Sequence, residues 1–137
     1  MSAAGSGNGN PIGNGPPTCV LLVEDDALVR ESIREHLERR NYVCVEAASG
    51  AEALQLLQSQ TPDVIVTDIA MPGMNGIEFL LKSRALGCRL PAILLTAVND
   101  TSVLALGRDA GAFCSLPKPP DYAQLDAMIQ RGLALNQ

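Results

Sequence analysis

Short apolar runs alternate along the chain with segments in which apolar residues recur at helical spacing. A short continuous apolar run indicates a buried strand, and the helical spacing indicates an amphipathic helix. The apolar runs predict strands at 19–23, 42–47, 64–68, 92–96 and 113–116. The helical spacing predicts helices that carry Leu28, Val29, Ile33 and Leu37; Ala51, Leu54 and Leu57; Ile77, Leu80 and Leu81; Val103, Leu106 and Ala110; and Tyr122, Leu125, Ile129 and Leu133.

This repeated alternation of strand and helix predicts an α/β fold. Short connections between the elements favour a parallel sheet that helices cover on both faces. Roughly 120 residues are too few for a closed eightfold barrel, so the open, doubly wound arrangement remains. In such sheets ligands bind beyond the carboxyl ends of the strands. The residues at those ends are therefore the candidates for chemistry.

One predicted strand end carries the clearest candidate. The strand at 64–68 ends on Asp68, and the chain then enters two turn-forming pairs, Pro72-Gly73 and Asn75-Gly76. Alone, Asp68 fits a polar strand end or a helix cap as well as a functional group. The other strand ends favour a functional role for Asp68, because they bring further polar residues to the same edge of the sheet.

The polar residues at these ends form an acidic cluster together with one hydroxyl and one ammonium group. They are Glu24, Asp25 and Asp26 after the first strand, Asp68 on the third, Thr96 on the fourth and Lys118 after the fifth. Carboxylates close together repel one another, and a divalent cation relieves that repulsion. An all-oxygen site suits Mg²⁺. A carboxylate nucleophile beside a metal, a lysine and a hydroxyl is suited to accept a phosphoryl group. Asp26 also stands where it can cap the following helix.

Composition narrows the range of functions further. The chain has 137 residues, 47% apolar and 18% charged, with a net charge of −5. These numbers predict one packed domain. Without a basic patch, neither nucleic acid binding through this domain nor binding to an anionic membrane is expected. No apolar run approaches the ~20 residues of a membrane span.

The N-terminal segment and the cysteines indicate the compartment. Residues 1–17 consist almost entirely of Gly, Asn, Ser and Pro, which predicts a flexible tail before a domain at 18–137. This tail lacks the basic and apolar regions of a signal peptide. The four cysteines, Cys19, Cys44, Cys88 and Cys114, show no metal-ligand spacing. We therefore expect reduced thiols and a cytoplasmic location.

The order of these motifs resembles the receiver domain of two-component response regulators, from Thr18 to about Leu135. The matching segments are Val-Glu-Asp-Asp at 23–26, Thr-Asp-Ile-Ala-Met-Pro-Gly-Met-Asn-Gly at 67–76, Leu-Thr-Ala at 95–97, Gly-Ala at 111–112 and Lys-Pro at 118–119. Each segment alone is weak evidence for the family. Together, in this order and each at a strand end, the segments are highly specific for it. The resemblance implies a flavodoxin-like (βα)5 fold with five helices and strand order 2-1-3-4-5.

The resemblance also implies a role for each candidate residue. Asp68 is the expected phosphoacceptor, and Thr96 and Lys118 contact the phosphoryl group. Asp25 and Asp26 bind Mg²⁺, Asp26 the more directly, helped by Asp68 and the backbone carbonyl of Ala70. Glu24 is expected to be a spectator acid. The bond between Lys118 and Pro119 is expected to be cis.

The same resemblance implies the partners. The phosphoryl donor is a histidine kinase or a histidine phosphotransfer protein. Phosphorylation changes partner binding at the face formed by the fourth helix, fifth strand and fifth helix, and a phosphorylation-dependent homodimer through that face is possible in relatives. At the usual aromatic switch position the chain has Ser115, which argues against the family's coupling between the threonine and an aromatic ring.

Two other functions are compatible with parts of the pattern. A pseudo-receiver would keep the fold for binding only, although the intact acids, acceptor and lysine argue against it. A phosphatase of the haloacid dehalogenase type also uses a strand-end aspartate, Mg²⁺ and a lysine. Enzymes of that class carry an Asp-x-Asp motif, in which the first Asp is the nucleophile and the second is the general acid. Here the position of the second Asp is occupied by Ala70, which cannot donate a proton to a leaving group. The expected protein is a switch and not an enzyme.

Overall fold

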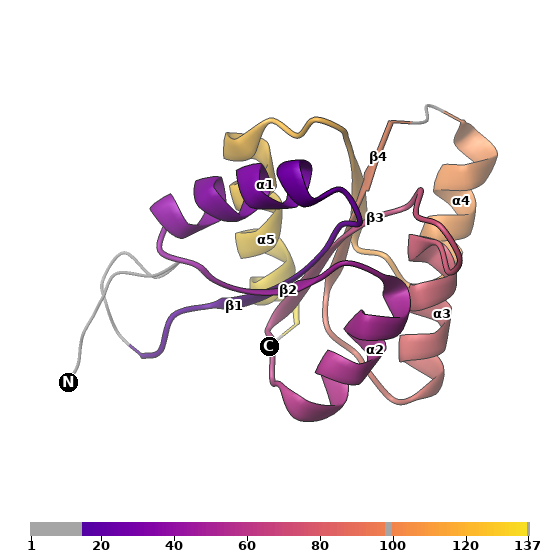
Figure 1. The fold of residues 1–137 in the computed structure, drawn as a ribbon, viewed down its shortest axis with the longest axis horizontal. Helices are drawn as coiled ribbons and strands as arrows, with labels where there is room; N and C mark the ends of the chain where they lie inside the picture. The colour runs from indigo at the N-terminus through magenta and orange to yellow at the C-terminus, as the bar shows by residue number, and fades with distance from the viewer. Residues whose placement is uncertain (1–14, 98–99, 137) are drawn as a thin grey trace.

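The structure is a computed structural model, and it describes residues 15–97 and 100–136 (Figure 1). In these ranges five strands alternate with five helices. The strands are β1 (Cys19–Val23), β2 (Val43–Ala47), β3 (Val64–Asp68), β4 (Ala92–Thr96) and β5 (Cys114–Pro117). The helices are α1 (Ala27–Arg39), α2 (Gly50–Ser59), α3 (Gly76–Ala85), α4 (Thr101–Asp109) and α5 (Tyr122–Leu135). The tail expected at 1–17 falls outside the described residues up to position 14.

All strand pairs of this sheet are parallel, and the strand order is β2-β1-β3-β4-β5. The predicted α/β fold and strand order are therefore confirmed. β1 and β3, in the middle of the order, are buried on both faces, which matches their continuous apolar sequences. In this register Asp68 of β3 pairs with Leu95 of β4, so strands β3 and β4 end at the same edge.

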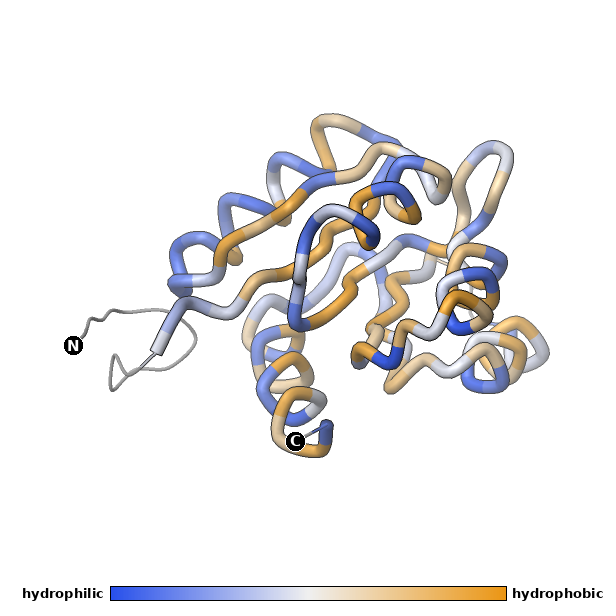
Figure 2. The backbone as a smooth tube through the Cα atoms, turned by 90° about the horizontal axis from the view of Figure 1, so that it is seen from below, coloured by the Kyte–Doolittle hydropathy of each residue, from blue (hydrophilic) through white to orange (hydrophobic). Residues whose placement is uncertain are grey.

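Two apolar layers hold the helices against the sheet. On one face Ile33 and Leu37 of α1 and Leu125 and Ile129 of α5 pack on the sheet. On the other face the layer includes Ala53 of α2 and residues of α3, so α2, α3 and α4 cover that side (Figure 1). The strands lie between helices that alternate polar and apolar residues along their length (Figure 2). The site therefore rests on a rigid, closely packed base.

Three strand bounds differ by one residue from the sequence prediction. The amide of Tyr42 donates to the carbonyl of Leu37 at the end of α1, so β2 begins only at Val43. The Tyr42 side chain is 3% exposed, and its hydroxyl contacts Asp126 and Gln130 of α5. At the other edge, β5 runs from Cys114 to Pro117 instead of from 113 to 116. Its last residue, Pro117, pairs in register with Thr96 of β4.

The helices that follow β1, β2 and β3 begin with capping side chains close to where the strands end. Asp26 caps α1 as predicted, accepting from the amides of Leu28 and Val29. Asn75 and Glu78 form a reciprocal capping box at the start of α3. These caps fix how each chain segment leaves the sheet edge. Within the described residues, none of the helices has the length and apolar character needed to cross a membrane.

Candidate functional site

Polar side chains from distant parts of the chain meet at the carboxyl edge of the sheet. Glu24 and Asp25 follow β1 directly, Asp68 is the last residue of β3, and Lys118 follows β5. One oxygen from each of Glu24, Asp25 and Asp68 can be chosen so that all three lie within 4.8 Å of one another. We call these three residues the acidic group. Their convergence is a consequence of parallel strands that end at a common edge.

The acidic group is more buried than its charge would favour. Glu24 is 1% exposed and Asp68 is 4% exposed, while Asp25 faces the solvent. Burial raises the pKa of the Glu24 carboxyl and the charge of Asp68 raises it further, against the lowering influence of Lys118 and of the Asp26 amide. The site therefore holds two buried carboxyl groups that repel each other when both are ionised.

Lys118 lies between the two buried acids. Its Nζ is 2.6 Å from Oε1 of Glu24 and 2.9 Å from Oδ2 of Asp68. Burial alone would lower the pKa of Lys118, but its contacts with Glu24 and Asp68 raise the pKa above the usual value. The ammonium is thus held in its charged form beside Asp68. The peptide bond from Lys118 to Pro119 is cis, as the resemblance implied.

Asp26 takes the capping role that the sequence predicted, and it is not one of the three residues of the acidic group. Its Oδ1 accepts hydrogen bonds from Leu28 N at 3.0 Å and Val29 N at 3.2 Å. Its expected role as a Mg²⁺ ligand stays a prediction, and the acidic group contains Glu24 beside Asp25. The sequence placed Glu24 among the strand-end acids without a ligand role, although its position directly after a buried strand was the available signal. The backbone amide of Asp26 donates to Oε2 of Glu24, which fixes that side chain inward.

The Glu24 carboxylate is buried, and the ammonium of Lys118 is paired with its Oε1 at 2.6 Å. Buried carboxylates close to one another repel, and a nearby cation offsets that repulsion. Together with Asp25 and Asp68, Glu24 offers hard oxygen donors of the kind that Mg²⁺ takes. The residues present therefore fit such an ion.

Thr96, Ser115 and Ala70 occupy the surroundings of this site. Thr96 is 7% exposed at the end of β4, and its carbonyl accepts the amide of Lys118 at 3.0 Å. Ser115 is half-buried and lines a pocket of about 430 Å³ together with Thr96, Leu104 and Lys118. The small side chain of Ser115 leaves open a space next to Thr96. Ala70 lies exposed two residues beyond Asp68, and the role of its carbonyl stays a prediction.

The loop after β3 returns closely to Asp68. The amide of Gly76 donates to the carbonyl of Ile69 at 2.8 Å. A Cβ atom at position 76 would lie 2.1 Å from the backbone oxygen of Asp68, which no real contact tolerates. Gly76 is therefore needed for the start of α3 to pack against the residue that carries the central carboxylate.

Comparisons with known proteins agree with this geometry. The family model described as response regulator receiver domain matches residues 20–130. The response regulator MprA of Mycolicibacterium vanbaalenii is 43% identical over 114 residues, covering 83% of this chain and 49% of the relative. The DNA-binding transcriptional regulator NtrC of Escherichia coli strain K12 is 36% identical over 115 residues, covering 84% of this chain and 24% of the relative. The chain spans about half or less of the length of these relatives.

Solved structures of similar proteins have the same fold as this chain. The receiver domain of the Francisella response regulator 1452 superposes with a TM-score of 0.82 at 28% identity, covering 88% of this chain and 99% of that one. The Vibrio cholerae chemotaxis protein CheY4 superposes with a TM-score of 0.80 at 32% identity, covering 85% and 98%. The chain belongs to the response regulator receiver domain family, the signal-receiving module of two-component systems.

Proposed function

We propose that this domain is a phosphorylation-controlled switch in which Asp68 accepts a phosphoryl group. The observation that carries the proposal is the contact of the Lys118 ammonium with Asp68, beside a group of three carboxylates at the carboxyl edge of the sheet. A histidine kinase or a histidine phosphotransfer protein supplies the phosphoryl group. The reaction takes place in the cytoplasm, in agreement with four cysteines that are free in the described structure.

The transfer is a displacement at phosphorus. A carboxylate oxygen of Asp68 forms the new P–O bond as the bond from phosphorus to the donor's histidine nitrogen breaks, and that nitrogen keeps the electron pair. Glu24, Asp25 and Asp68, with the carbonyl of Ala70, would hold Mg²⁺. When bound, this ion supplies positive charge that offsets the charge on the phosphoryl oxygens.

The chain's own residues bind and orient the group. Lys118 is held charged beside Asp68 and stabilises the negative charge of the incoming phosphoryl oxygens. The Thr96 hydroxyl donates to one of those oxygens and moves inward with it. The movement alters the face formed by α4, β5 and α5, where a partner or a second copy of the chain binds. The half-buried Ser115 next to Thr96 indicates that this coupling does not use an aromatic ring at position 115.

The domain acts as a phosphoacceptor and not as an enzyme with turnover. A phosphatase of the haloacid dehalogenase type needs a second acid two residues after the nucleophile, and Ala70 stands there. Without that acid, no side chain at this position protonates a leaving group. Steady release of phosphate from a phosphomonoester would contradict this view.

Intact mass measured after incubation with Mg²⁺ and acetyl phosphate tests the proposal. Acetyl phosphate replaces the protein donor, because its phosphoryl bond breaks with loss of acetate. One added phosphoryl group, removed by hydroxylamine, is expected. Asp68→Asn should lose it while keeping the fold, and Asp109→Asn, a matched change at an exposed aspartate at the end of α4, should keep it.

Two results would count against the proposal. A phosphoryl group that persists in Asp68→Asn at the wild-type level would place the acceptor elsewhere. A folded wild-type protein that takes no phosphoryl group from acetyl phosphate or from any histidine kinase or phosphotransfer protein would favour a binding-only pseudo-receiver.

A further inference from the structure

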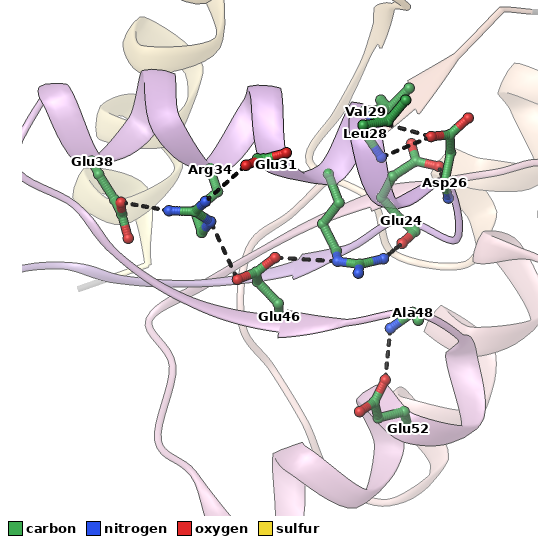
Figure 3. Close-up of polar contacts among 11 residues, drawn as sticks. Glu24, Asp26, Leu28, Val29, Glu31, Arg34, Glu38, Glu46, Ala48 and Glu52 are labelled. Carbon is green, nitrogen blue, oxygen red and sulfur yellow. Dashed lines mark hydrogen bonds and ion pairs between the residues drawn. The ribbon is translucent and has the colours of Figure 1, made fainter.

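Arg30 of α1 joins the acidic group to the neighbouring strand β2. Its Nη1 donates to the backbone carbonyl of Glu24 at 2.7 Å, and its Nε donates to Oε1 of Glu46 at 3.2 Å. Glu46 lies on β2, and Figure 3 shows Glu24, Glu46 and Arg34 around this junction. The Arg30 side chain is only 19% exposed, so both of its bonds lie close to the body of the protein. The planar guanidinium is suited to holding two acceptors at once.

The backbone of Glu24 is fixed on both sides by these contacts. Its amide donates to the carbonyl of Ala47 at 3.0 Å, and its carbonyl accepts from Arg30. Both partners depend on β2, because Arg30 is anchored on Glu46, the neighbour of Ala47. With its peptide groups held in this way, Glu24 keeps its carboxylate turned toward Lys118 and leads directly into Asp25.

We propose that Arg30, anchored by Glu46, is a positioning residue that holds Glu24 and Asp25 in the geometry needed to bind a divalent cation. The inference rests on the proposed function, in which that cation is Mg²⁺. Three carboxylates that approach one another tend to separate, since their charges repel. A clamp on the backbone of Glu24 opposes this separation without using any carboxylate oxygen of the acidic group. Those oxygens stay available for the metal.

The sign of the effect distinguishes positioning from simple electrostatics. Arg30 carries a positive charge near a cation site, so through charge alone its removal would strengthen Mg²⁺ binding. As a positioning residue its removal must weaken Mg²⁺ binding. Supporting groups of this kind typically change metal affinity by 10- to 100-fold.

Arg34 offers a matched control on the same helix. It shares the anchor, with Nε 3.3 Å from Oε2 of Glu46, and it forms further ion pairs with Glu38 and Glu31 (Figure 3). Its side chain is 27% exposed, close to the value for Arg30. These ion pairs join it to α1 and β2, one helical turn away from the bond that Arg30 makes to Glu24. Loss of either arginine removes one positive charge and part of the Glu46 network.

The test compares Arg30→Met and Arg34→Met with the wild-type domain. The Mg²⁺ dissociation constant of the unphosphorylated protein is measured by titration of the Asp25 amide resonance, with the melting temperature recorded for each variant without metal. Arg30→Met is expected to weaken Mg²⁺ binding by about tenfold. The Mg²⁺ dissociation constant of Arg34→Met should stay within about twofold of the wild-type value, even if its melting temperature is as low as that of Arg30→Met. At saturating Mg²⁺ the rate of phosphorylation by acetyl phosphate in Arg30→Met should approach the wild-type rate.

A second variant keeps the test decisive if Arg30→Met folds poorly. Arg30→Lys retains the charge but cannot reproduce the two-pronged contact, and it should also weaken Mg²⁺ binding. Unchanged or tighter Mg²⁺ binding in these Arg30 variants would overturn the positioning role while leaving the proposed function intact. A wild-type domain that binds no Mg²⁺ would overturn both. Equal weakening in Arg30→Met and Arg34→Met would show a general loss of structure and would also overturn the proposal.

Discussion

The ammonium of Lys118 lies 2.9 Å from Oδ2 of Asp68, although fifty residues separate the two in the chain. The contact arises because β3 and β5 run in the same direction and end at the same edge, with β4 between them. The same ammonium reaches Glu24, which comes from the far side of β3 in the strand order. A single cation thus links three strand ends around the carboxylate that we propose as the acceptor.

Replacing Lys118 by Ala should leave phosphoryl uptake possible but weaken the response to it. The acceptor carboxylate remains, but the cation that senses the phosphoryl oxygens is lost. The measurement is the change in the amide spectrum on phosphorylation, compared with Lys82→Ala at an exposed position of α3. A phosphorylated-state spectrum of Lys118→Ala equal to that of the wild type would contradict the assigned role.

Glu24→Gln should stabilise the metal-free domain at neutral pH. Burial raises the pKa of Glu24, so the folded state disfavours its ionised form. A carboxyl with a raised folded-state pKa contributes stability below its unfolded pKa of about 4.3, and that contribution is lost as the pH rises through the folded-state pKa. The ionised side chain therefore costs stability at pH 7, and glutamine removes the cost.

Melting temperatures between pH 4 and pH 8 would check this prediction. The advantage of Glu24→Gln should disappear toward pH 4, and saturating Mg²⁺ should reverse the order by stabilising the wild type more. Glu35→Gln, at an exposed position of α1, serves as the control and should follow the wild type. An advantage that stayed constant across the whole pH range would mean that burial of charge is not its cause.

Substitutions at the two neighbouring aspartates should separate capping from metal binding. Asp26→Ala should lower stability by about 1 kcal/mol, because it removes the acceptor for two amides at the start of α1. Asp26→Asn should keep both stability and Mg²⁺ affinity, since asparagine caps helices equally well. Asp25→Asn should lose most of the Mg²⁺ affinity with little change in stability. Loss of Mg²⁺ binding in Asp26→Asn would restore Asp26 as a ligand.

Gly76→Ala should destabilise the domain by about 1–3 kcal/mol, the usual cost of forcing an extra methyl into a packed site. The added Cβ would meet the backbone oxygen of Asp68, which cannot move without displacing the acceptor residue. Denaturant unfolding measures the loss, and Gly50→Ala provides a contrast because its new Cβ would meet mainly the flexible side chain of Met74. Equal stabilities of Gly76→Ala and the wild type would disprove the close approach.

Ser115→Tyr should fold with a stability within about 1 kcal/mol of the wild type, because the ring can enter the existing pocket beside Thr96 and Leu104. Leu116→Phe, one residue further along β5 and 5% exposed, should lose about 1–3 kcal/mol from overpacking. Denaturant unfolding curves of the two variants give the free energies of unfolding to be compared. A Ser115→Tyr protein as unstable as Leu116→Phe would show that the pocket cannot take the ring.

The broad architecture followed from the sequence because it depends on local patterns. Continuous apolar runs such as Val20-Leu21-Leu22, bounded by turn-forming and charged residues, indicate strands buried on both faces, and parallel strands joined by helices end at a common edge. Asp25, Asp68 and Lys118 could therefore be placed together before any contact was known. The cap at Asp26 was also predictable, since it depends only on the residues that follow it.

Which acids after β1 turn inward was decided only by tertiary structure. Glu24, Asp25 and Asp26 are three consecutive carboxylates, and beyond the cap at Asp26 their residue types do not say which of them turns inward. The hydrogen bonds of the Glu24 backbone to Ala47 and Arg30, and the demand of α1 for a cap at Asp26, assign each its direction. The sequence by itself determined the fold and the kind of site, because periodicity and residue type are local properties. The structure alone assigned Glu24 its place, because side-chain direction depends on partners from β2, α1 and β5 that local patterns do not specify.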